Sequence, residues 1–222
     1  MRKYKGIIFD FNGTLILDDE LHFKAWQRHA KELGVELSAE TYYGLIHGST
    51  NELAYEVLYN KPIPKELVGV FGNQKEIYYR EMFKESPPPM AKGAKELIDF
   101  LNENNIPHAI ATSSEISNVS FFKEIYNLEK LFGENITYND GTLRGKPYPD
   151  IYLRAADKLG IGADELITVE DSASGAKACK ASGSPLVIGI CPRGKEKFVG
   201  AENTDMVITD FTELDYKNLL AY

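Results

Sequence analysis

The hydrophobic pattern of the chain alternates between short apolar runs and longer amphipathic segments. Short runs rich in β-branched residues, typical of buried strands, cover 5–10, 107–112, 165–170, 185–190 and 205–209. In the segments between them, apolar residues recur three and four positions apart, which indicates helices with one buried face, at 91–104, 115–127, 149–160 and 172–183. Strands that alternate with helices in this way predict a parallel sheet covered by helices on both faces.

Residues 16–85 depart from this alternation, because their pattern is helical and contains no strand-like run. One helical stripe consists of Phe23, Trp26, Ala30 and Leu33, and further helical segments cover 51–60 and 64–83. We therefore predict an α/β protein with two parts. A parallel-sheet core is formed by 1–15 and 86–222, and an all-helical cap, 16–85, is inserted after the first strand.

The composition and charge of the chain argue against nucleic-acid and membrane partners. With 25 Lys and Arg against 33 Asp and Glu, the net charge is −8, so a nucleic-acid partner is not expected. No apolar run approaches the roughly 18–20 residues that span a bilayer, and Asp10 interrupts the N-terminal apolar stretch. Cys179 and Cys191 lack metal-site spacing and are expected to be reduced. We expect a cytoplasmic protein without a membrane partner.

Polar side chains gather where the predicted strands end, which is the edge at which open α/β sheets bind ligands. They are Asp10 and Asn12 after the first run, Thr112, Ser113 and Ser114 after the second, and Glu170 and Asp171 after the third, with Lys146 ahead of a predicted helix. Carboxylates suit Mg²⁺, hydroxyls and an ammonium hold phosphoryl oxygens, and an Asp can form an aspartyl-phosphate. Each feature alone is typical of a helix cap or turn, but together they indicate phosphoryl transfer.

Four motifs carry a resemblance to a known family. They are IIFDFNGTL around Asp10, HAIATSS around Thr112, GKPYPD around Lys146 and TVEDSASGAKACKASG around Glu170 and Asp171, in this order between residue 5 and about residue 190. The chain resembles the haloacid dehalogenase superfamily, a mostly phosphatase group with helical caps. Within it, HFKAW (22–26) is similar to the early cap helix of the branch that contains β-phosphoglucomutase and related sugar-phosphate phosphatases.

The resemblance implies a Rossmann-like core and a role for each motif residue. Asp10 would be the nucleophile and a Mg²⁺ ligand, position 12 would lend its backbone carbonyl to Mg²⁺, and Glu170 and Asp171 would complete the metal site. Thr112, with the Ser113 N–H, would bind the transferring phosphoryl group, beside the hydroxyl of Ser114. Lys146 would tie that group to the nucleophile, and Gly13 would let the backbone turn tightly beside the phosphate.

Asn12 departs from the family motif, which has Asp, the usual general acid/base, at this position. An amide cannot donate a proton to a leaving alkoxide and take one back from water, and this assistance is typically worth about 10²–10⁴ in rate. Three explanations stay open. The substrates have good leaving groups, as acyl and aryl phosphates do; another group, with His22 as the candidate, supplies the proton; or the chain is a weak or inactive catalyst that still binds Mg²⁺ and phosphate.

A second departure concerns the substrate. The mutase of this branch grips a second phosphate with a cap Arg, whereas the corresponding stretch here, HGSTNEL (47–53), has Asn51 and no Arg. A neutral amide holds a bisphosphorylated sugar poorly, which favours a monophosphate hydrolase. Lys75 is a candidate to reach the substrate from the cap, the alternative being a solvated helix lysine. His22 is likewise either a residue at the mouth of the site or a half-buried cap residue.

We therefore expect a Mg²⁺-dependent phosphatase that acts on small phosphorylated metabolites through a phosphorylated Asp10, slowed by Asn12. The alternatives are a β-phosphoglucomutase-like mutase and a catalytically impaired protein that binds Mg²⁺ and phosphate. The expected partner is a small phosphorylated metabolite, and the expected assembly is a monomer or small homo-oligomer.

Overall fold

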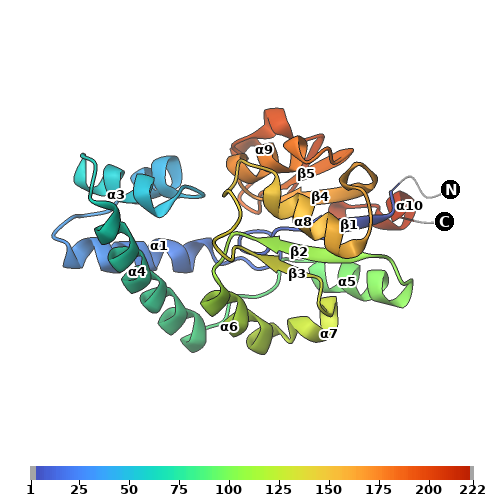
Figure 1. Ribbon diagram of the computed structural model, residues 1–222, viewed down its shortest axis with the longest axis horizontal. Helices are drawn as coiled ribbons and strands as arrows, with labels where there is room; N and C mark the ends of the chain where they lie inside the picture. Colours follow the sequence, from blue (N-terminus) through green and yellow to red (C-terminus); the bar gives the residue numbers. More distant parts are fainter. Residues whose placement is uncertain (1–3, 221–222) are drawn as a thin grey trace. The chain divides into compact units, whose positions relative to one another are not determined.

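The computed structural model describes residues 4–220 and contains two compact units (Figure 1). The sheet unit consists of the chain up to Leu17 and from Pro89 onward, and the helical unit consists of residues 18–88. Each unit has its own buried core. No helix among residues 4–220 combines the length and the apolar character needed to cross a bilayer.

The sheet unit is built on six parallel strands in the order β3-β2-β1-β4-β5-β6. The strands are β1 (Gly6–Phe9), β2 (His108–Thr112), β3 (Ile136–Tyr138), β4 (Leu166–Glu170), β5 (Leu186–Ile190) and β6 (Met206–Ile208). This is the order of a doubly wound Rossmann-type sheet, which confirms the predicted fold class. The edge strand β3 was not predicted, so Glu170 ends the fourth strand and not the third.

Helices cover both faces of this sheet, α8 and α9 on one face and α5, α6 and α7 on the other (Figure 1). The helices of the sheet unit are α5 (Ala94–Glu103), α6 (Ile116–Tyr126), α7 (Leu128–Phe132), α8 (Asp150–Leu159), α9 (Ala173–Ala181) and α10 (Tyr216–Leu220). Side chains of β1 alternate between the two faces, because Ile8 packs with Tyr152 of α8 whereas the ring of Phe9 contacts Phe132 of α7. Asp10 comes two residues after Ile8, so its side chain is expected on the same face of the sheet as Ile8, the face covered by α8 and α9.

The helical unit packs its own aromatic core. Its elements are α1 (Asp19–Glu32), α2 (Ala39–Thr41), a π-helical turn (Tyr42–Ile46), α3 (Asn51–Tyr59) and α4 (Lys65–Glu85). Trp26 and Ala30 of α1 are buried with Tyr55 of α3, and Phe23 and Leu33 pack against this cluster. The predicted stripe on α1 is thus confirmed as the buried face of that helix.

Candidate active site

The site begins with two carboxylates on neighbouring strands. In the β1–β4 pairing Phe9 lies opposite Val169, so Asp10 and Glu170 come next to each other at the carboxyl edge of the sheet. The Asp10 N–H donates to the Val169 carbonyl at 3.0 Å, which continues the ladder by one residue. Both residues are almost fully buried. Two buried like charges side by side need a cation between them.

Lys146 supplies that cation from the loop before α8. Its Nζ lies 2.6 Å from Asp10 Oδ1 and also donates to Glu170 Oε1. Burial alone would lower the pKa of Lys146, but the two carboxylates outweigh it and raise that pKa above its ordinary value. Lys146 is therefore fully charged at neutral pH and holds the nucleophile candidate in one position.

Every oxygen of the Glu170 carboxylate has donors. Oε1 accepts from Lys146 and, at 2.9 Å, from the hydroxyl of Tyr152, and Oε2 accepts at 3.0 Å each from the Asp171 N–H, the Ser172 N–H and the Ser172 hydroxyl. Burial alone would raise the pKa of Glu170, but Lys146 and these hydrogen bonds lower it. Gly175 makes room for the carboxylate, because a Cβ there would lie 1.9 Å from Glu170 Cδ.

A tight turn after β1 presents Asn12. The N–H groups of Leu15 and Ile16 both donate to the Phe11 carbonyl, at 2.8 and 3.1 Å, and Gly13 within this turn has a φ of 73°. That backbone conformation is strained for residues other than glycine, which explains the Gly13 of the motif.

Hydroxyls from the end of β2 surround the Asn12 amide. The Ser114 hydroxyl donates to Asn12 Oδ1 at 2.9 Å, and the Thr112 hydroxyl lies 3.5 Å from the same oxygen. The Ser114 N–H in turn donates to Thr112 Oγ1 at 3.1 Å. Ser113, between them, is exposed. The amide oxygen at position 12 is thus held as an acceptor beside the predicted phosphate-binding hydroxyls.

The donor set fits a hard divalent cation. Carboxylate oxygens of Asp10, Glu170 and Asp171 lie within 4.8 Å of one another. Three carboxylates against the single Lys146 ammonium leave an excess of two negative charges at this edge of the sheet. Oxygen ligands and negative charge are what Mg²⁺ selects in proteins, and sulfur and imidazole ligands are absent from this group of three.

The comparison with family models agrees with this geometry. The model described as haloacid dehalogenase-like hydrolase matches residues 4–183, which include all four motifs and most of the chain. The chain belongs to the haloacid dehalogenase-like hydrolase family. Its resemblance in sequence is thereby confirmed at the level of the family.

Relatives of this hydrolase act on phosphorylated carbohydrates. The chain is 26% identical over 189 residues to the phosphorylated carbohydrates phosphatase of Thermotoga maritima, with 84% of this chain and 85% of that one covered. Among solved structures, a haloacid dehalogenase hydrolase of family IA, variant 3, from Entamoeba histolytica has a TM-score of 0.90 at 36% identity over 97% of both chains. An Asp-to-Asn variant of CbbY from Rhodobacter sphaeroides in complex with xylulose-(1,5)bisphosphate has a TM-score of 0.80 at 26% identity over 96% of both chains.

Two predicted substrate contacts of the hydrolase, His22 and Lys75, lie in the helical unit and contact each other there. Lys75 is buried, with its Nζ 3.2 Å from His22 Nδ1 and 2.5 Å from Glu76. His22 Nε2 lies 3.4 Å from the buried Asp18 carboxylate, and its ring stacks on Tyr79 with 4.0 Å between centroids. Lys75 is therefore not a solvated helix lysine, and both ring nitrogens of His22 have partners within the helical unit.

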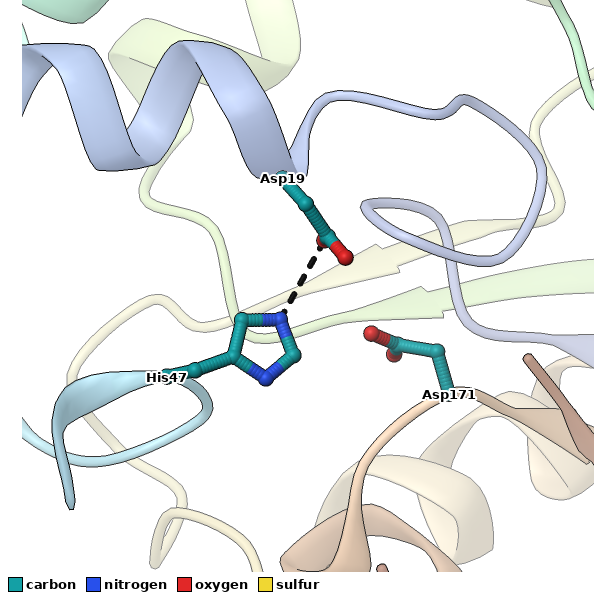
Figure 2. A group of neighbouring side chains, drawn as sticks. All are labelled: Asp19, His47 and Asp171. Carbon is teal, nitrogen blue, oxygen red and sulfur yellow. Dashed lines mark hydrogen bonds and ion pairs between the residues drawn. The ribbon is translucent and has the colours of Figure 1, made fainter. Parts of the chain in front are cut away.

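The stretch 47–53 of the helical unit contains one acidic residue, Glu52, and no Lys. The His47 ring lies 3.2 Å from the Asp19 carboxylate, as Figure 2 shows, and the same figure labels Asp171, which follows β4 in the sheet unit. Asn51 faces α4, where a Cβ on Gly72 would lie 2.6 Å from its Nδ2. No arginine side chain exists in this stretch.

Two residues that shape the hydrolase site were not predicted, Tyr152 and Gly175. Both hold Glu170, one by a hydrogen bond and one by lacking a side chain. The sequence contains a partial indication of Tyr152, because this residue falls on the predicted buried face of the helix that begins shortly after Lys146. Its hydroxyl on a face of apolar residues indicates a buried polar partner.

Proposed function

We propose that this hydrolase is a Mg²⁺-dependent phosphatase of small phosphorylated sugars and related metabolites, with Asp10 as the nucleophile. The observation that carries the proposal is the Lys146 ammonium 2.6 Å from the Asp10 carboxylate, beside the acidic group of Glu170 and Asp171. Asp10, Asp171, Glu170 and the backbone carbonyl of Asn12 are the proposed ligands of the metal. When bound, Mg²⁺ would screen the repulsion between a carboxylate and a phosphoryl group.

The proposed reaction has two displacements. One oxygen of Asp10 attacks phosphorus, the P–O bond to the leaving group breaks, and an aspartyl-phosphate forms. Thr112, Ser113 and Lys146 hold the non-bridging oxygens and so position the phosphoryl group in line. Water then attacks the phosphorus of the aspartyl-phosphate, which releases inorganic phosphate and restores the Asp10 carboxylate. The helical unit is proposed to act as a cap that excludes other water.

Asn12 restricts the leaving group in this scheme. Its amide cannot protonate a departing alkoxide. The leaving group must therefore be a weak base that departs without a proton, or it must take its proton from another donor. His22 is the proposed alternative donor, but it must first release Asp18 or Lys75, which occupy its two ring nitrogens. Substrates with good leaving groups need neither step. His22 and Lys75 remain proposed contacts to the substrate.

Two other functions are compatible with parts of the site. A mutase requires repeated proton transfer and a grip on a second phosphate, and Asn12 and Asn51 both weigh against it. A protein that binds Mg²⁺ and phosphate without turnover is favoured by one observation, the neutral amide at position 12 held by Ser114. Phosphate binding without release of product distinguishes that protein from a phosphatase.

The test is phosphate release from p-nitrophenyl phosphate, acetyl phosphate and a panel of sugar monophosphates, with Mg²⁺ and with excess EDTA. The unaltered chain and Asp10→Asn are compared, and mass spectrometry verifies that Asn12 has not deamidated. Activity that needs Mg²⁺ and disappears in Asp10→Asn supports the proposal. A chain that binds Mg²⁺ and phosphate but releases no phosphate from any substrate contradicts it and leaves the binding protein.

A further inference from the structure

A buried phenol lies directly behind the acidic group. Tyr152 is fully buried, its ring packs in the core between the sheet and α9, and its hydroxyl donates to Glu170 Oε1 at 2.9 Å. Tyr152 comes from α8, the helix that follows the Lys146 loop. One short segment of the chain therefore supplies two donors to the same carboxylate oxygen.

The sharing of that oxygen couples Tyr152 to the nucleophile. Lys146 donates to both Asp10 and Glu170, so its position between them depends on how well each carboxylate is satisfied by other donors. If the phenol is removed, Glu170 Oε1 keeps Lys146 as its only donor among the contacts described above. The ammonium is then drawn toward Glu170 Oε1 and away from Asp10, and the Glu170 carboxylate is held mainly by the three donors to Oε2, so Oε1 is less firmly positioned.

We propose that Tyr152 is a positioning residue of the metal site, which fixes the Glu170 carboxylate and thereby sets the affinity for Mg²⁺. This inference rests on the proposed function, because it assumes that the acidic group holds the metal. Outer donors that orient a metal-binding carboxylate typically contribute a factor of about 10–100 in affinity. Tyr152 does not contact the phosphoryl group in this scheme and acts only through Glu170.

The test is the affinity of the full chain for Mg²⁺, measured by isothermal titration calorimetry for Tyr152→Phe. Phenylalanine keeps the ring that fills the core and removes only the hydroxyl. The matched control is Ser184→Ala, which removes another buried hydroxyl of the sheet unit. The Ser184 hydroxyl donates to the Leu166 carbonyl at 2.8 Å and accepts from the Thr168 hydroxyl at 3.0 Å, and neither contact includes Glu170. Thermal unfolding of both variants reports the structural cost of each deletion.

We expect Tyr152→Phe to bind Mg²⁺ about 10-fold more weakly, while Ser184→Ala keeps the affinity of the unaltered chain. In a Glu170→Gln background, Tyr152→Phe should have no further effect on the affinity, since it acts through Glu170. An unchanged Mg²⁺ affinity in Tyr152→Phe, with a thermal shift like that of the control, overturns the inference alone. If the unaltered chain binds no Mg²⁺, the inference and the proposed function fail together.

Discussion

The Lys146 ammonium lies 2.6 Å from the Asp10 carboxylate, although 136 residues separate the two in the chain. The fold brings them together because β1 and β4 are neighbours and the loop before α8 returns to the same edge of the sheet. The ammonium also contacts Glu170, so one buried cation separates two buried anions. The proposed chemistry and the stability of this edge of the sheet therefore involve the same side chain.

Replacement of that cation tests the dependence. Lys146→Met keeps an unbranched side chain that reaches to the Cε position, but it removes the ammonium and leaves Asp10 and Glu170 without their shared counter-charge. We expect a loss of roughly 3–5 kcal/mol in the free energy of unfolding at pH 7 without metal, typical of a broken buried pair. Added Mg²⁺ should recover part of this loss by binding the two carboxylates. Chemical denaturation with and without Mg²⁺ measures both effects.

A surface lysine provides the control for Lys146→Met. Lys92 lies 3.3 Å from Asp210, but its side chain is 74% exposed. Lys92→Met should change the free energy of unfolding by less than about 1 kcal/mol, as is usual for exposed ion pairs. Equal losses in the two variants would show that the burial of Lys146 does not increase its contribution to the free energy of unfolding.

The second prediction concerns the space that Gly175 leaves for Glu170. A Cβ at this position would overlap the Glu170 carboxylate at 1.9 Å, so Gly175→Ala must displace that side chain. Displacement breaks the contacts of Glu170 with Lys146 and Ser172, and we expect the Mg²⁺ affinity and the turnover of the variant to fall at least about 10-fold. Calorimetric titration with Mg²⁺ and phosphate-release assays measure the two losses.

Gly69 offers a matched substitution within another helix. It lies in α4, and a Cβ there would meet no atom within 4 Å. Gly69→Ala should leave the Mg²⁺ affinity unchanged and raise stability slightly, because alanine is the better helix former by about 1 kcal/mol. Comparable losses of Mg²⁺ affinity in both variants would contradict a specific role for Gly175.

The parts of the fold that could be predicted from the sequence are those in which apolar residues form a clear run or recur with a clear helical period. The apolar runs of β1, β2, β4 and β5 are flanked by helical segments, and each was predicted within one or two residues of its bounds. β3 has only three residues, Ile136–Tyr138, between polar neighbours. The other edge strand, β6, is equally short but wholly apolar, Met206–Ile208, and was predicted, whereas β3 contains Thr137 between polar flanks and so carries too little apolar character to distinguish a strand from a loop.

The candidate site divides in a similar way. Asp10, Thr112, Lys146 and Glu170 were predicted because each ends a strand or precedes a helix in a family motif, and the fold places them at one edge of the sheet. The contact between Tyr152 and Glu170 could not be predicted, since it depends on the rotation of α8 about its axis and on the depth of its packing. Sequence spacing determines neither quantity.

The third prediction is a pH dependence of the helical unit. His29 of α1 is only 3% exposed, and its ring packs against Phe71 with 5.7 Å between centroids. Neither ring nitrogen has a hydrogen-bond partner among the described residues, and the Glu32 carboxylate lies 3.9 Å from Nδ1. Burial lowers the pKa of His29, Glu32 partly opposes this shift, and the charge of Lys75 adds to it.

The sign of the effect follows from the lowered pKa. Below about pH 6.5 the unfolded chain binds a proton at His29 that the folded chain resists, so stability falls as the pH falls through this range. Trp26, the single tryptophan, lies in the helical unit and reports its unfolding by fluorescence. We expect His29→Phe to lose less stability than the unaltered chain between pH 7 and pH 5. Parallel losses in the two proteins would assign the pH dependence to other groups.

The fourth prediction concerns the leaving group that Asn12 allows. Asn12→Asp introduces a carboxyl group at the position where the family has its general acid/base, beside the Ser114 hydroxyl that now donates to the amide at 2.9 Å. For sugar monophosphates, whose alkoxide leaves poorly, we expect the rate of phosphate release to rise by about 10²–10⁴. For acetyl phosphate, whose leaving group needs no proton, the rate of aspartyl-phosphate formation should change little.

The comparison of the two substrates separates proton transfer from a general repair of the site. Asn12→Asp also adds a negative charge near the acidic group, which would alter Mg²⁺ affinity and affect every substrate alike. Assays at saturating Mg²⁺ remove that contribution. If acetyl phosphate and the sugar phosphates then accelerate equally, Asn12 limits a step other than leaving-group protonation, such as attack by water on the aspartyl-phosphate. An unequal response in favour of the sugar phosphates identifies the missing proton donor as the reason for a restricted range of substrates.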